Sequence, residues 1–481
     1  MTAQTILPAN TLSSGFDVAN SARFNDASDT YLNKTFGSSG NRKTFTISFW
    51  IKKCVSKDHG QSDGLMILGG QQNSYPGFLL FYNRTTDTLV FRDAQASNNI
   101  KFDVRTDAKF RDLSAWSHIV IAMDTTQGTA SNRIKVYING TQTTDLNGNA
   151  ASGGGTETPL YPDQNFDSQF NGNEAHYINK YATNYEDFYL CEYCFIDGQQ
   201  LAADQFGEFD EDSPNIWKPI DVSGLTFGTN GFYLDFEDSS DFGNDANGSN
   251  NWTANNFTTL DQSTDTCTNN FCTMNPLDNY FASSTFSEGN LKITTNASNQ
   301  TFNTGTIGLS TGKWYWEAKL IQAGGEEAIG ITDIVSTGTG IYGGKTANNY
   351  SFKGNNGNIR NNDNNSSYGS AYAEDSIVSV FMDLDNNKLY FAIDGTLQNS
   401  GTGISITAPA STSTGFYFPM IGDVDSDSVI WECNFGSPSF AISSGNTDGE
   451  YGNFEFSTTI TGDGASKTFK AINTKNLAEY G

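Results

Sequence analysis

Short runs that alternate large apolar and small polar residues constrain the fold of this chain more than any other feature. Residues 45–51, for example, read Phe-Thr-Ile-Ser-Phe-Trp-Ile. Successive side chains of a strand point to opposite faces, so such a run predicts a half-buried antiparallel strand. Strand-like runs recur at 78–82, 88–91, 188–196 and 377–391. No segment keeps an apolar 3.6-residue period for more than a turn or two, and we therefore predict an all-β fold.

The length of 481 residues implies more than one domain, because a single hydrophobic core rarely serves more than roughly 250 residues. The 48 glycines and an aromatic content of 13% are typical of folded β-domains with many loops. Trp252 and Phe257 are predicted to tether a polar connector to a neighbouring domain. We predict four parts, namely a first sandwich at 1–242, the connector at 243–285, a second sandwich at 286–440 and a C-terminal extension at 441–481.

The charge of the chain excludes two classes of partner. The 27 Lys and Arg residues face 54 Asp and Glu residues, which gives a net charge of −27. This charge repels nucleic acid and anionic lipid. The first ten residues carry no export signal, and no run of apolar residues predicts membrane insertion. We expect a protein that is made in the cytoplasm and that, if it acts outside a cell, arrives there as part of a particle.

Two motifs in the first half of the chain resemble one known family. Residues 116–120 read Trp-Ser-His-Ile-Val, and residues 135–140 read Lys-Val-Tyr-Ile-Asn-Gly. The Asn139-Gly140 pair predicts a tight type I′ hairpin. This pattern resembles the laminin-G/concanavalin-like jelly roll. The segments 21–25 and 195–199 resemble versions of that domain in structural proteins of tailed bacteriophages of the marine, cyanophage type.

Motifs in the second half resemble the SPRY family, in the order in which that family carries them. They are Gly-Lys-Trp-Tyr-Trp-Glu at 312–317, the hairpin pattern at 377–391, Phe-Tyr-Phe-Pro at 416–419 and Asn-Phe-Gly at 434–436. SPRY is itself a concanavalin-like sandwich. The two resemblances imply two concanavalin-like antiparallel β-sandwiches (jelly rolls) in tandem. The tail at 469–477 resembles a segment that follows such domains in phage proteins, and we expect it to be docked.

The resemblances imply a virion-associated appendage, of tail-fibre or spike type, that binds host glycan through sandwich loops and is not an enzyme. The expected partners are a host surface polysaccharide or lipopolysaccharide and other virion proteins, with a homo-oligomer, a trimer above all. One alternative is a purely structural head-decoration or tail-collar protein. A second alternative is a polysaccharide depolymerase, which would need two carboxylates in a cleft.

Glycan sites commonly pair an exposed aromatic ring with Asn and Asp side chains. The segment 342–372 has this composition and is predicted to be a binding loop. An ordinary polar insertion would have the same composition. Loops at 58–76 and 146–175 are further candidates with fewer aromatics. The predicted glycan-binding residues are Tyr350, Asn361, Asn362, Asp363, Asn365, Tyr368 and Tyr372.

No cofactor is required by this hypothesis, but Ca²⁺ is a candidate because its oxygen ligands are abundant. One predicted calcium loop contains Asp238, Asp241 and Asp245. The alternating aspartates at 423–427 are a second candidate, although a hairpin turn explains them as well. Acidic residues would also gather in this way by chance in so acidic a chain.

Other groups of reactive side chains predict no chemistry. The acidic segment 208–212 lacks the alternation of a glycoside hydrolase strand and indicates a solvated loop. Cys191 and Cys194 lie on a predicted strand, where residues three apart point to opposite faces, so we expect packing and not zinc binding. None of the three histidines has a partner at ligand spacing; they are His59, His118 (an expected packing residue) and His176.

Overall fold

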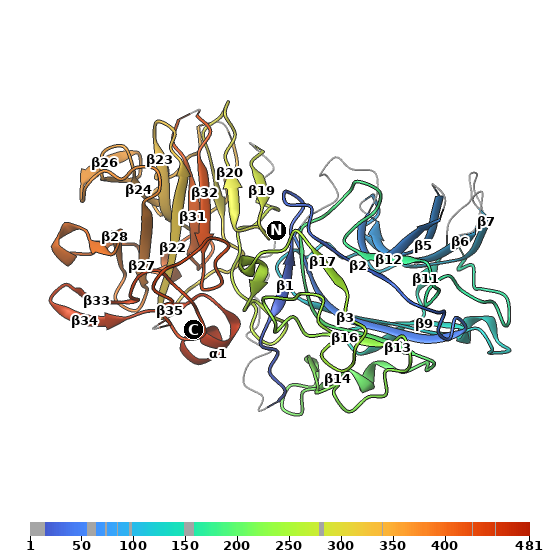
Figure 1. Cartoon of the computed structure of the whole chain (residues 1–481). Helices are drawn as coiled ribbons and strands as arrows, with labels where there is room; N and C mark the ends of the chain where they lie inside the picture. Colours follow the sequence, from blue (N-terminus) through green and yellow to red (C-terminus); the bar gives the residue numbers. More distant parts are fainter. Residues whose placement is uncertain are drawn as a thin grey trace. The chain divides into compact units, whose positions relative to one another are not determined.

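The computed structural model describes residues 15–54, 64–72, 75–83, 85–95, 99–148, 158–278, 283–338, 340–425, 427–447 and 449–481. These residues are almost entirely β, with one α-helix, α1 (Thr474–Tyr480), so the predicted all-β fold is confirmed. None of the helices in these ranges is long and apolar enough to cross a membrane. The chain divides into two compact units, of which the first ends at Thr268 and the second begins at Asn269 (Figure 1).

The first unit is built from two large antiparallel sheets. One has the order β10-β9-β8-β3-β13-β1-β18, with β16 beside β13. The predicted Asn139-Gly140 turn joins β9 to β10, and both residues have positive φ, 45° and 80°. The bounds are β1 (Ser21–Phe24), β3 (Thr44–Lys53), β8 (Ser117–Asp124), β9 (Ile134–Ile138), β10 (Thr141–Thr143), β13 (Phe188–Asp197), β16 (Phe232–Leu234) and β18 (Gln262–Ser263).

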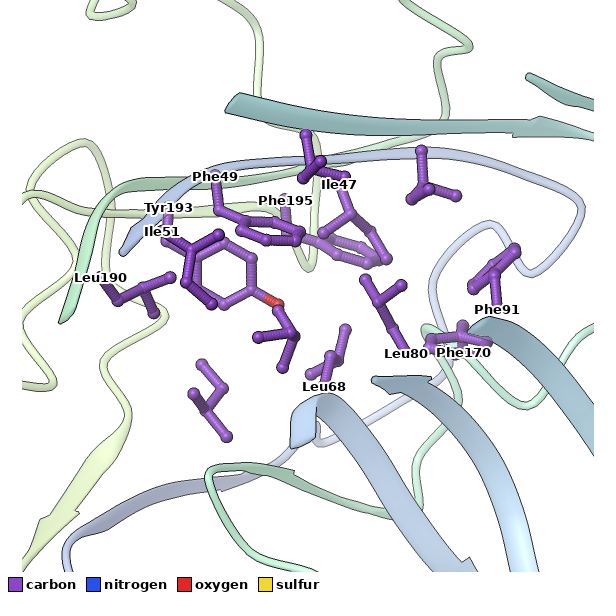
Figure 2. Close-up of a cluster of buried hydrophobic side chains, with 14 of the residues drawn as sticks. Ile47, Phe49, Ile51, Leu68, Leu80, Phe91, Phe170, Leu190, Tyr193 and Phe195 are labelled. Carbon is purple, nitrogen blue, oxygen red and sulfur yellow. The ribbon is translucent and has the colours of Figure 1, made fainter. Parts of the chain in front are cut away.

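The second sheet of this unit has the order β11-β7-β6-β5-β4-β12-β2-β17. Apolar side chains from both sheets point toward one another and form the core; Figure 2 shows Ile47, Phe49 and Phe195 facing Leu68 and Leu80. The bounds are β2 (Tyr31–Thr35), β4 (Leu65–Gln72), β5 (Tyr75–Asn83), β6 (Thr88–Gln95), β7 (Asn99–Thr106), β11 (Leu146–Asn147), β12 (Ala175–Ile178) and β17 (Thr253–Asn255).

The segment that was expected to be a connector is part of both units. Strand β17 pairs with β2, and β18 pairs with β1. Trp252 is buried in the first core, with its ring 5.1 Å from that of Phe232. Phe257 packs 5.1 Å from the ring of Phe24. The first sandwich therefore continues past residue 242 to Thr268. Trp252 is a core residue of the first unit, and Phe257 packs against that core.

A β-bulge changes the positions of two cysteines on β13. The register with β3 shifts between Cys191 and Cys194, and Glu192 has a φ of 51°. A bulge inserts an extra residue and reverses the facing of the residues beyond it. Both cysteines consequently pack in one cluster on the same face of the sheet, and the prediction that they point to opposite faces is wrong. The sulfur of Cys191 lies 3.7 Å from that of Cys267.

The second unit also has two large sheets. The nine-stranded sheet has the order β19-β20-β32-β22-β27-β28-β29, with β30 beside β28 and β35 beside β22; β22, β27 and β32 run side by side in Figure 1. Its bounds are β19 (Thr285–Ser287), β20 (Lys292–Thr294), β22 (Lys313–Gln322), β27 (Ile377–Asp383), β28 (Lys388–Ile393), β29 (Thr396–Leu397), β30 (Ile404–Ser405), β32 (Ile430–Asn434) and β35 (Lys470–Ala471).

The six-stranded sheet has the order β21-β31-β23-β24-β25-β26. Trp314, Trp316 and Trp431 are fully buried in the core that this sheet shares with the first. The C-terminal tail is docked as expected, because β35 pairs with β22 and Phe469 and Ile472 are fully buried. The bounds are β21 (Thr301–Thr304), β23 (Glu327–Thr332), β24 (Tyr350–Lys353), β25 (Asn358–Asn361), β26 (Asn364–Ser367) and β31 (Phe418–Asp423).

Candidate functional site

The aromatic residues of the predicted glycan loop lie in the core of the second unit. The segment 342–372 contains strands β24, β25 and β26 and is not a loop. Tyr350, Tyr368 and Tyr372 are only 7%, 6% and 6% exposed. The Tyr372 hydroxyl donates to the carbonyl of Phe352 at 2.9 Å. These rings cannot stack on a sugar, so this prediction is wrong.

The polar residues of the same segment form the β25–β26 hairpin, which is held by hydrogen bonds within the second unit. Asn362 and Asp363 occupy the two-residue turn between β25 and β26, with φ of 49° and 61°. Asp363 accepts hydrogen bonds from Tyr342, Lys345 and Arg360, and the bond from Lys345 is the largest of the effects that lower the pKa of this carboxyl. Asn361 and Asn365 lie on the paired strands β25 and β26.

The predicted calcium loop is a series of turns. Asp238 accepts from the backbone and hydroxyl of Ser240, and Asp241 accepts from the backbone of Gly243. Asp245 is buried, and its oxygens accept from the backbone N–H groups of Tyr233 and Asn250 at 3.0 and 2.8 Å. Nowhere in the described ranges does a group of three or more His, Cys, Asp or Glu side chains have a geometry that could hold a metal ion. Neither these three aspartates nor those at 423–427 form such a group.

Two other predicted groups have structural roles. Lys218 lies 3.3 Å from Glu208 and 3.4 Å from Asp210, so part of the acidic segment is neutralised by an ion pair. His118 is buried, as expected of a packing residue, and burial lowers its pKa to about 3. The ring accepts at Nδ1 from the Trp217 indole at 2.9 Å, and its Nε2 lies 2.9 Å from the Ser48 hydroxyl.

Three tyrosines gather on the outer face of the second sheet in the first unit, away from the core. Leu32 of β2 and Ile178 of β12 are fully buried and point inward. Because strand residues alternate, their neighbours Tyr31 and Tyr177 face outward, and both are half-buried. The ring centroids of Tyr31 and Tyr177 are 6.4 Å apart, and that of Tyr185 lies 5.9 Å from Tyr31.

Asn179 holds the loop that carries Tyr185. This asparagine is 1% exposed and has a φ of 61°, a conformation that Asn tolerates better than most residues. Its amide nitrogen donates to the carbonyls of Thr30 and Glu186, and its amide oxygen accepts from the Glu186 N–H. The amide thereby joins both ends of the loop 180–185 to the start of β2, which fixes the positions of the loop side chains.

Lys180 lies among the three rings. Its Nζ is 4.0 Å from the ring centroid of Tyr31, 5.7 Å from that of Tyr177 and 6.0 Å from that of Tyr185. An ammonium this close to an aromatic face is stabilised by the ring quadrupole. Burial alone would lower the pKa of Lys180. Hydrogen bonding to Tyr31 and the electrostatic interaction with Tyr185 outweigh burial and raise this pKa. Lys180 is therefore cationic at neutral pH. We call Tyr31, Tyr177, Tyr185 and Lys180 the tyrosine cluster.

A pocket of about 150 Å³ opens beside the tyrosine cluster. Gly70 of β4 is part of its lining, and an added Cβ there would meet the Phe78 ring at 2.4 Å and the Ala175 carbonyl at 2.6 Å. Only glycine therefore allows β4 and β12 to approach in this way. The pocket is lined by Gly70, Tyr177, Lys180, Tyr181 and Ala182.

Comparisons with known proteins agree with the two sandwiches. Residues 26–174 match the concanavalin A-like lectin/glucanases superfamily, in its Laminin_G_3 form. Residues 313–422 match the SPRY domain family. The chain carries a concanavalin-like domain and a SPRY domain in tandem. Both kinds of domain indicate a role in binding carbohydrate or protein.

Two solved structures are among those similar to the chain. One is the SPRY domain of human HERC1, with 11% identity, a TM-score of 0.26 and coverage of 33% of this chain and 96% of that one. The other is stonustoxin, with 16% identity, a TM-score of 0.27 and coverage of 34% of this chain and 27% of that one. The search of curated proteins returned no match.

The tyrosine cluster of the concanavalin-like domain was not foreseen from the sequence, although one signal was present. Three tyrosines and a lysine fall within the nine residues 177–185. Tyr31 is far away in sequence and joins them through the pairing of β2 with β12. The candidate loops 58–76 and 146–175 lie partly outside the described residues, and His59 lies outside them altogether.

A second pocket of about 350 Å³ lies elsewhere in the first unit, and none of its described lining residues carries a charged side chain. The rings of Phe242 and Phe257 stack there at 4.5 Å. Phe242 is 3% exposed, so less ring surface is available there than in the tyrosine cluster. Its other lining residues are Ser239, Ser240, Ala254, Asn256, Thr258 and Thr259.

Proposed function

We propose that the chain is a virion-associated appendage protein whose concanavalin-like domain binds a host cell-surface glycan at the tyrosine cluster. Three half-buried tyrosine rings around a cation, beside an open pocket, carry this proposal. Such rings present an apolar face to the C–H side of a sugar, while the hydroxyls and the ammonium serve its oxygens. No catalytic step and no metal is part of the proposal.

The virion context is supported by the phage-like sequence motifs at 21–25 and 195–199. A shallow site of this size binds weakly on its own. Presentation of several copies raises the avidity without any new contact. We therefore propose a homo-oligomer, with a trimer as the first expectation, in the form of a tail fibre or spike.

A glycan array with the full-length protein tests the proposal. The variants are Tyr177→Ala and, as a matched control, Tyr451→Ala. Tyr451 of the second unit is 51% exposed, and the Lys475 ammonium lies 5.2 Å from its ring centroid. We expect Tyr177→Ala to weaken binding about tenfold, which corresponds to about 1.4 kcal/mol, and Tyr451→Ala to leave it unchanged. A chelator should have no effect. Equal binding by both variants would contradict the site.

A structural role in the virion is the second candidate, and one observation favours it. Strand β26 is at the edge of its sheet, and all four of its residues are exposed. An exposed edge strand can pair with another chain. Asn365→Lys together with Ser367→Lys should disfavour such pairing, because charged side chains protect exposed edge strands. Loss of incorporation into particles, with glycan binding intact, would support this role for the SPRY domain.

A further inference from the structure

In the described part of the chain, Lys180 differs from Lys313 and Lys345 of the second unit in having no carboxylate partner. Lys313 lies 2.6 Å from Asp385, and Lys345 lies 2.8 Å from Asp363. Lys180 makes no ion pair with any carboxylate in the described part of the chain, and its neighbours are tyrosine rings. Its positive charge is stabilised by these rings but is not neutralised.

The pocket beside Lys180 has a charge opposite to that of the whole protein. The chain has a net charge of −27, whereas the described residues that line this pocket include one cation and no acid. Lys180 takes part in both the tyrosine cluster and the pocket lining. One side of its ammonium therefore faces the rings, and an anion in the pocket could approach another side.

The environment of Lys180 would strengthen an ion pair with a ligand. The surrounding rings exclude part of the solvent, and a charge pair near a protein surface is screened less than one in bulk water. A single ammonium is a point charge that can pair with a carboxylate, whereas bidentate recognition of phosphate typically uses the guanidinium fork of arginine.

We infer that the tyrosine cluster selects sugars that carry a carboxylate, such as hexuronic or sialic acid residues, with the carboxylate at Lys180 and the sugar ring against Tyr177. This inference rests on the proposed function and adds the class of glycan. Lys180 would distinguish acidic from neutral sugars. The tyrosine rings would stack on sugars of both kinds.

The test uses the full-length protein on an array with matched probes. The probes are a galacturonic acid oligomer, its methyl ester, a sialylated glycan, its desialylated form and a set of neutral glycans. We expect every glycan whose binding depends on Tyr177 to carry a carboxylate, and to bind at least tenfold more tightly than its neutral counterpart. Raising the salt concentration should reduce that preference, because added ions screen the part of the charge pair that faces solvent.

Three variants test whether the Lys180 ammonium causes the preference for acidic probes. Lys180→Met keeps an unbranched apolar stem but removes the charge, and should abolish the preference for acidic probes. Lys180→Arg keeps the charge and should retain it. Lys475→Met, which removes the lysine beside Tyr451 in the second unit, should leave the preference unchanged.

The outcomes separate the two proposals. If glycans that depend on Tyr177 are bound equally in acidic and neutral form, or if Lys180→Met keeps the preference, the inference is overturned while the glycan site stands. If the array shows no glycan whose binding depends on Tyr177, the proposed function fails and the inference fails with it.

Discussion

Burial sets the charge of several single side chains in this protein. Glu192 of β13 is 6% exposed, and its carboxylate accepts a hydrogen bond from the Tyr233 hydroxyl at 2.7 Å. Burial raises the pKa of Glu192 to about 8 in spite of that bond. The folded concanavalin-like domain therefore holds a proton that the unfolded chain, with an ordinary glutamate, loses near pH 4.5. Lys180, in contrast, keeps its charge because aromatic rings surround it.

The first prediction concerns the pH dependence of stability. Above about pH 4.5 the folded state binds one more proton at Glu192 than the unfolded state does, so this residue lowers the stability as the pH rises toward 8. The loss between pH 5 and 8 should be about 3 kcal/mol. Glu192→Gln should remove this slope. Urea denaturation of the first unit at both pH values measures it, and an unchanged slope in the variant would show that Glu192 is ionised when folded.

At the scale of the element, alternation and turn residues were sufficient to predict the strands. The Asn139-Gly140 pair predicted the hairpin between β9 and β10 because few other residues adopt positive φ. Sequence periodicity was not sufficient to locate the site. Tyr350 and Tyr372 lie in a segment with the composition of a sugar site, but both side chains are buried in the core of the second unit. On β13, a bulge of one residue places Cys194 on the same face as Cys191.

The second prediction isolates a steric contact at that hairpin. Gly140 and Gly464 both occupy the second position of a two-residue turn, with φ of 80° and 79°. An added Cβ would meet the Trp217 ring at 2.2 Å at Gly140, but nothing within 4 Å at Gly464. Gly140→Ala should destabilise its unit by about 3 kcal/mol, since it combines strain and overpacking, and Gly464→Ala by about 1 kcal/mol. Equal losses in denaturant unfolding would mean that Trp217 moves away freely.

At the scale of the whole molecule, each unit has a complete core of its own. Two sheets enclose the hydrophobic cluster of Figure 2 in the first unit, and two others enclose Trp314, Trp316 and Trp431 in the second. A domain with its own core can in principle fold alone. This division also assigns the proposed glycan site to one unit, because every residue of the tyrosine cluster lies before Thr268.

The third prediction follows from the division. Ser13–Thr268 and Asn269–Gly481, produced separately, should each unfold in one cooperative transition. The first fragment should bind the same glycans as the full-length chain, and the second should bind none of them. Calorimetry and the array measure these two properties. Binding by the second fragment alone would place the glycan site in the SPRY domain.

The position of a bound glycan tests the central claim most directly. The measurement is a crystal structure of the full-length protein with the glycan that binds most tightly on the array. We expect a sugar ring against Tyr177 in the pocket that Gly70 and Tyr181 line, with an oxygen of the sugar at Lys180. A glycan bound at the 358–367 hairpin of the SPRY domain, or beside Phe257, with the tyrosine cluster empty, would contradict the claim.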